Sequence, residues 1–112
     1  MHQSNALAAL SALAHEYRLR VFRLLVRHSP EGLAAGDIAA HMQLPPSSLS
    51  FHLGHLQRAG LIESRRKQRH IIYTANLGSM RRLLSFLTED CCNGHPEICA
   101  ELIPARRRHK SG

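Results

Sequence analysis

All three cysteines of the sequence fall within nine residues, at Cys91, Cys92 and Cys99. The adjacent pair is expected at the end of the last helix, and Gly94 and Pro96 favour a chain reversal that brings the third cysteine back towards it. Three thiolates on one loop suit a soft ion, because sulfur ligands select soft metals and metalloids. Trivalent arsenic and antimony fit this set best, since each forms a three-coordinate pyramid with sulfur. As(III) or Sb(III) is therefore the expected ligand.

The same window admits other chemistry. Zinc, cadmium or lead would use His95 beside the three cysteines, because zinc prefers four tetrahedral ligands. Cys99 could also pair with Cys91 or Cys92 in a thiol redox or persulfide switch, whereas neighbouring cysteines bridge each other only with strain. Packing as small apolar fillers is a further interpretation. These alternatives stay open on the residues alone.

Charge and composition limit the class of protein. Fifteen Lys and Arg against eight Asp and Glu give a net charge of +7, which favours nucleic acid as a partner. No stretch approaches the ~20 apolar residues of a membrane span. The sequence has no Cys-x-x-Cys pair, no nucleophile with a placed base and no phosphate loop, so no enzyme and no catalytic cofactor is expected. The N-terminus does not resemble a signal peptide, so we expect a cytoplasmic protein with reduced thiols and no membrane partner.

The elements that must position these groups are mainly helical. With 112 residues and no Trp, the chain has room for one aliphatic core. Hydrophobic spacing predicts five helices, over residues 5–13, 16–27, 36–42, 46–59 and 77–90, and a β-hairpin over 61–66 and 69–75. We expect one domain over residues 5–99 and a basic, disordered tail over 100–112.

The fourth predicted helix and the hairpin carry the candidate DNA-binding residues. A short helix, a tight turn, a second helix and a basic hairpin form a winged helix-turn-helix. The second helix should read base edges in the major groove with the polar side chains Ser47, Ser48, Ser50, His52 and Gln57. The cations expected to contact phosphates are Arg58, Arg65, Arg66, Lys67 and Arg69. The serines could instead be only capping residues, and core packing is as good an interpretation of His52.

The chain resembles the ArsR/SmtB family of winged-helix repressors. The resemblance is carried by residues 10–14 with 18–21, by 36–39, by the segment Ser48-Leu49-Ser50-Phe51-His52-Leu53 continuing through 58–62, and by 72–73. It implies a homodimer joined through the first and fifth helices, bound to double-stranded operator DNA with an inverted repeat. The family hairpin often has Gly at its tip where this chain has Gln68. A wider tip or an altered contact with the minor groove is therefore expected.

The resemblance also implies a role for the cysteines. One arsenic-sensing type in the family carries a cysteine pair in the third helix, but residues 36–41 contain none. A zinc-type site on the fifth helix needs histidine, and residues 77–89 contain none. The remaining pattern, a Cys-Cys pair and a third Cys after the last helix, resembles an arsenic-responsive repressor. It implies that As(III) or Sb(III) binds Cys91, Cys92 and Cys99 and releases the protein from the operator of an arsenic resistance operon.

Overall fold

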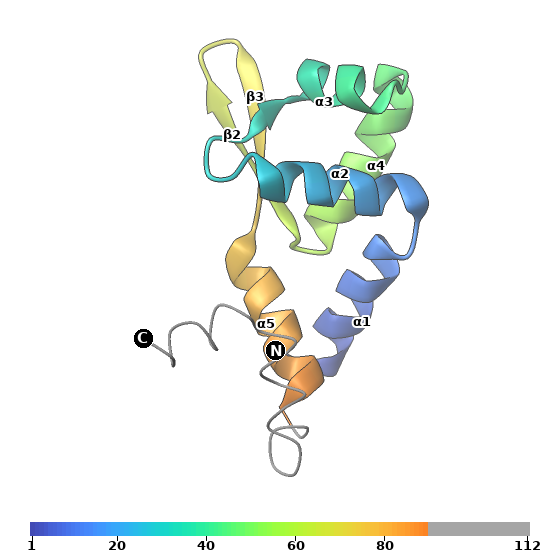
Figure 1. The fold of residues 1–112 in the computed structure, drawn as a ribbon, viewed down its shortest axis with the longest axis vertical. Helices are drawn as coiled ribbons and strands as arrows, with labels where there is room; N and C mark the ends of the chain where they lie inside the picture. Colours follow the sequence, from blue (N-terminus) through green and yellow to red (C-terminus); the bar gives the residue numbers. More distant parts are fainter. Residues whose placement is uncertain (90–112) are drawn as a thin grey trace.

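The computed structural model describes residues 1–89, and its elements follow the predicted order (Figure 1). The helices and strands are α1 (Gln3–Leu13), α2 (Glu16–Arg27), β1 (Leu33–Ala34), α3 (Ala35–Met42), α4 (Pro46–Arg58), β2 (Ile62–Lys67), β3 (His70–Ala75) and α5 (Leu77–Thr88). This is the mainly helical winged helix-turn-helix that the sequence predicts. The three cysteines, the predicted domain boundary at 99 and the basic tail all lie outside the described residues.

The strands form one antiparallel sheet in the order β1-β3-β2. β2 and β3 are the predicted hairpin, with Ile62 opposite Ala75 at its base and Lys67 opposite His70 at its tip. β1 was not predicted, because two residues are too short for any alternating pattern. It pairs Leu33 with Tyr73 and so attaches the base of the hairpin to the helical body.

The hydrophobic core lies where α2, α3 and α4 meet the base of the sheet. Its fully buried side chains include Val21, Phe22, Leu25, Ile38, Leu49, Leu56, Leu61 and Ile62. Leu19, on the same helix as Phe22 and Leu25, lies outside this core and is 43% exposed. The inner face of α1 is made of alanines, Ala6, Ala9 and Ala12, which allow that helix to approach the body closely.

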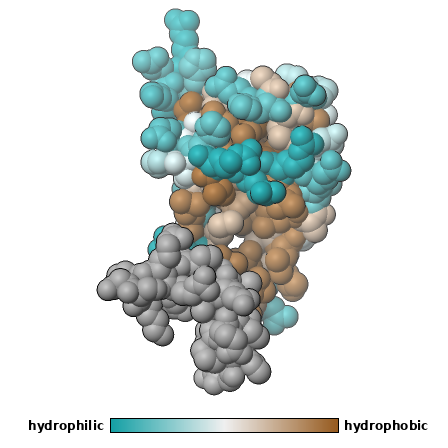
Figure 2. All heavy atoms as spheres, in the orientation of Figure 1, coloured by the Kyte–Doolittle hydropathy of each residue, from teal (hydrophilic) through white to brown (hydrophobic). Residues whose placement is uncertain are grey.

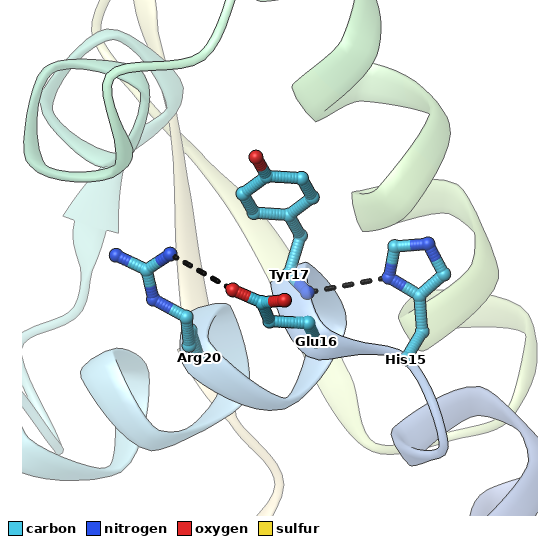
Figure 3. A network of polar contacts seen from close by, with 4 residues as sticks. All are labelled: His15, Glu16, Tyr17 and Arg20. Carbon is cyan, nitrogen blue, oxygen red and sulfur yellow. Dashed lines mark hydrogen bonds and ion pairs between the residues drawn. The ribbon is translucent and has the colours of Figure 1, made fainter.

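The corner between α1 and α2 is fixed by side chains that cap both helices. His15 is the N-cap of α2, and its Nδ1 accepts a hydrogen bond from the backbone N–H of Tyr17 at 3.2 Å (Figure 3). Arg18 Nε donates to the carbonyl oxygen of Ala12 at 2.7 Å, where α1 leaves its last carbonyls unpaired. The Glu16 carboxylate lies 3.8 Å from the guanidinium of Arg20, one turn along α2.

Apolar side chains remain exposed on α1 and α5. Leu7 is 58% exposed and Leu10 40%, while Leu77 is 41% and Leu87 48% exposed. Hydrophobic residues gather over α1 in the view of Figure 2, and hydrophilic residues cover α2 and the hairpin of β2 and β3, which is the wing (Figures 1 and 2). Contiguous apolar surface of this kind marks an interaction site. Among residues 1–89, no helix is both long and apolar enough to cross a membrane.

Candidate DNA-binding site

The turn between α3 and α4 is tight and has defined caps. α3 ends at Met42, and its C-cap residue Gln43 adopts the left-handed conformation with φ +56°. The next N–H, that of Leu44, donates to the carbonyl oxygen of Ala39 at 3.1 Å. α4 starts with Pro46 at its first position, where the missing N–H of proline costs nothing. α3 and α4 therefore form a helix-turn-helix whose second helix begins at a fixed point.

The serines of α4 lie at its N-terminal end, away from the core. Ser47 and Ser50 are exposed, and Ser48 is half-buried. The opposite side of the helix is held by Leu49, Leu53 and Leu56, which are buried. Contact of these serines with DNA stays a prediction, although the helix presents Ser47 and Ser50 in the way that such a contact needs.

His52 is not on the outer face of α4. Of the two interpretations of His52, a place among the serines is wrong and core packing is confirmed, because its side chain is only 8% exposed and its ring centroid lies 4.8 Å from that of His15. The ring of Tyr17 is 5.9 Å away. Its Nδ1 is buried and has no hydrogen-bond partner among residues 1–89. The His52 side chain, on α4, therefore packs against His15 and Tyr17 at the corner between α1 and α2.

Desolvation and neighbouring cationic side chains lower the pKa of His52 and of His55. Desolvation lowers the pKa of His52 below the ordinary value of 6.5, and His15, Arg18 and His55 lower it further. The pKa of His55 is lowered by desolvation and by Arg18, Arg58 and His15. The neighbours that lower these pKa values include Arg18 and Arg58 and no acidic residue. The electrostatic potential around the second half of α4 is therefore positive.

Gln57 and Arg58 lie at the far end of α4 from the serines. The Nε2 of Gln57 donates to Ser64 Oγ at 3.0 Å, so this amide links α4 to β2. Arg58 follows Ser47 by about 16 Å along the helix axis. Its side chain packs over Gly54 and, with Arg18 and His55, lines a groove beside α1. Neither residue lies beside the exposed serines that start the helix.

The wing carries the other predicted cations. The pairing of Lys67 with His70 leaves only Gln68 and Arg69 in the turn, and Gln68 supplies the left-handed φ of +58°. The expected wider tip is therefore wrong, because glutamine adopts the conformation that glycine would otherwise provide. Arg66 Nε donates to the Gln68 carbonyl oxygen at 3.5 Å within the tip.

The wing arginines differ in what holds them. Arg65 Nη2 donates to the carbonyl oxygen of Glu31 at 3.0 Å, which fastens the hairpin to the loop before β1. Lys67 and Arg69 are exposed at the tip and have no ion pair within residues 1–89. These two cations are the ones best placed to reach a phosphate.

Phe51 is a residue of this surface that the sequence reasoning missed. Its side chain is 60% exposed, and its ring lies edge-on to His55 with centroids 4.7 Å apart. Its position off the Leu49-Leu53-Leu56 stripe is the sequence signal that could have placed it outside the core.

A helix-turn-helix with an exposed second helix and a basic β-hairpin defines a winged-helix DNA-binding protein. Residues 13–65 match the helix-turn-helix domain family. Nodulation protein NolR of Rhizobium meliloti is 32% identical over 90 residues, which cover 79% of this chain and 71% of the relative. The HTH-type transcriptional regulator YgaV of Escherichia coli K12 is 31% identical over 87 residues, covering 78% of this chain and 86% of the relative.

Solved structures agree in fold. An ArsR-like transcriptional regulator from Rhodococcus sp. RHA1 has a TM-score of 0.73 at 23% identity, covering 87% of this chain and 89% of that chain. Reduced HlyU from Vibrio cholerae has a TM-score of 0.60 at 31% identity, and the match covers 75% of this chain and 88% of that chain. Mb0332 from Mycobacterium bovis, a possible ArsR-family regulator, has been solved as a homodimeric winged helix-turn-helix domain. Its TM-score is 0.63 at 24% identity, and the match covers 84% of this chain and 83% of that chain.

The chain belongs to the ArsR family of winged helix-turn-helix transcriptional regulators. It is a DNA-binding regulator and not an enzyme.

Proposed function

We propose that the chain is a homodimeric repressor of an arsenic resistance operon, released from its operator when As(III) or Sb(III) binds Cys91, Cys92 and Cys99. The observation that carries the proposal is the position of the cysteines, which begin three residues after the end of α5 at Thr88. Three sulfur donors match the coordination of a trivalent metalloid. The protein would work in the cytoplasm, where its DNA is present and its thiols are reduced.

The exposed leucines of α1 and α5 are the proposed dimer interface. The four side chains that would be buried between subunits are Leu7, Leu10, Leu77 and Leu87. The Mb0332 domain, which has a similar fold, is homodimeric, and this supports a dimer. A two-fold dimer offers two copies of α4 and of the wing, so its operator should be an inverted repeat.

Short connections would carry the signal from the cysteines to the DNA-binding surface. Only Asn76 separates β3 from α5, and its side-chain Oδ1 caps α5 by accepting from the N–H of Ser79 at 3.1 Å. The backbone N–H of Asn76 donates to the Leu61 carbonyl oxygen at 2.8 Å, just after α4 ends. A shift of α5 on ion binding would therefore reach both the wing and the end of α4. By linkage, DNA must weaken ion binding by the same factor.

The experiment that tests this proposal is operator binding with and without arsenite. Wild-type protein should bind operator DNA and release it on addition of arsenite. Cys91→Ser and Cys99→Ser should bind the same DNA equally well in the absence of arsenite and remain bound in its presence. Release of either variant by arsenite would refute the ligand assignment, while failure of the wild type to bind any duplex would refute repression itself.

A thiol redox or persulfide signal is the second candidate, favoured by the similarity to a relative solved as reduced HlyU. In this case Cys99 would pair with Cys91 or Cys92, and an oxidant would release the DNA. Mass spectra after persulfide treatment would show the modified cysteines. Cadmium, lead or zinc, with His95 as a further ligand, would instead give absorption changes on metal titration.

A further inference from the structure

In its first turns, the outer face of α4 carries one large side chain among small ones, and Arg58 follows on the same face at the far end, packed over Gly54. Ser47, Ser50, Phe51 and Gly54 recur at the spacing i, i+3, i+4 and i+7, which places them on a single helix face. Gly54 has no side chain, and the two serines are short. Phe51 therefore projects furthest from the part of the helix that a DNA groove would meet.

The Phe51 ring is oriented by a neighbour although it stands outside the core. It is 60% exposed, and the buried residues Leu49 and Leu53 on either side of it in the sequence face the other way. The His55 imidazole, one turn later, meets the phenyl ring at 73° with centroids 4.7 Å apart. An edge contact of this kind restricts the ring.

A phenyl ring has no hydrogen-bonding group and cannot read the donor and acceptor pattern of base edges. The apolar group that the major groove offers it is the 5-methyl group of thymine. A single exposed apolar residue is ordinary on a protein surface. Here the residue stands between Ser47, Ser50 and Gly54, on the face that the helix-turn-helix presents to DNA.

We propose that Phe51 contacts the 5-methyl group of a thymine in each operator half-site and thereby selects that base. This inference rests on the proposed function, because it assumes that α4 enters the major groove of an operator.

The test is a double-mutant cycle between protein and DNA. The full-length wild-type protein first selects its operator from a random duplex pool, and each thymine of that operator is then replaced in turn by deoxyuridine, which lacks only the methyl group. At one position per half-site, the replacement should weaken wild-type binding about fourfold, the loss that corresponds to one buried methyl group. Phe51→Ala should bind the thymine and uracil duplexes with equal affinity.

The control variant is Leu19→Ala, which truncates an exposed apolar side chain on α2, outside the helix-turn-helix. It should retain the full wild-type response to uracil. Unchanged thermal unfolding of Phe51→Ala would show that the fold is intact. If no thymine responds, or if Phe51→Ala responds as the wild type does, the inference is overturned while DNA binding stands. If the wild type enriches no duplex, the proposed function itself fails, and the inference fails with it.

Discussion

The imidazole rings of His15 and His52 lie 4.8 Å apart between centroids and are tilted by 47°. His15 belongs to the corner between α1 and α2, and His52 belongs to α4. The contact therefore connects the helix expected in the dimer interface with the helix expected in the DNA groove. The position of α4 depends on the packing of these two rings against each other.

Protonation of His52 should cost stability. The pKa of His52 is lowered in the folded chain, first by desolvation and then by His15, Arg18 and His55. As the pH falls below 6.5, the unfolded chain takes up the proton before the folded chain does. The stabilisation is thus fully present above 6.5 and is lost as the pH falls through the lowered pKa, with a slope of up to about 1.4 kcal/mol per pH unit.

The measurement is urea unfolding at a series of pH values. His52→Phe keeps a ring against His15 and Tyr17 but removes the titrating nitrogens, so its stability should fall less steeply below pH 6.5. His70→Phe, on the exposed wing, is the matched control and should keep the wild-type slope. An identical slope for wild type and His52→Phe would show that His52 is not the group responsible.

Charge on the exposed leucine surface should separate the subunits. Leu7→Glu or Leu87→Glu would place an unpaired carboxylate in the proposed interface. Sedimentation should then show a monomer, and operator affinity should fall on the order of 100-fold, because two linked helices bind with avidity. Leu19→Glu, on a similarly exposed leucine of α2, should remain dimeric. A dimeric Leu87→Glu would place the interface elsewhere.

The free cations of the wing tip should contribute to affinity without affecting sequence preference. Lys67→Ala and Arg69→Ala should each reduce the slope of log K against log salt by about 0.9 for every phosphate that the wild-type side chain neutralises. Binding should weaken alike for specific and unrelated duplexes. Arg65→Ala is the matched comparison, and its effect on this slope should be smaller because its guanidinium is bonded to Glu31. If the wild type and the three variants have equal slopes of log K against log salt, the wing does not contact DNA.

Substitution of Gly32, where the chain enters the sheet, should lower the stability of the fold. It adopts φ +81°, and a Cβ there would lie 2.5 Å from the carbonyl oxygen of Tyr73. Gly32→Ala should therefore lower the free energy of unfolding by at least about 1 to 2 kcal/mol. Gly36→Ala in α3 is the control, since a Cβ there meets nothing within 4 Å and alanine favours helix. Thermal unfolding of the two variants should move in opposite directions.

The sequence was informative where periodicity was strong. The bounds of α2 were predicted without error, because arginines and apolar residues alternate with helical period and Pro30 and Gly32 follow. β1 escaped prediction, since it exists only through pairing with β3. Pairing partners that lie far apart in the chain leave no local signal.

The sequence predicted the two elements of the DNA-binding surface, α4 and the wing, but not the position of every side chain on them. His52 was expected among the serines, yet it follows Leu49 by three residues and precedes Leu56 by four, which is the spacing of the buried face. Attention to this spacing would also have placed Phe51 outside. The hydrogen bonds from Gln57 to Ser64 and from Arg65 to Glu31 join different elements of the fold. No local pattern in the sequence could predict them.

The proposed role of the three cysteines is that an ion bound to them controls operator binding. It is tested most directly by measuring operator affinity against arsenite, antimonite, cadmium, zinc and an oxidant at one salt concentration. This role predicts release by arsenite and antimonite at the lowest concentrations, and no release by arsenite from a protein with all three cysteines replaced by serine. Release by the oxidant alone, with operator affinity unchanged by arsenite, would contradict it.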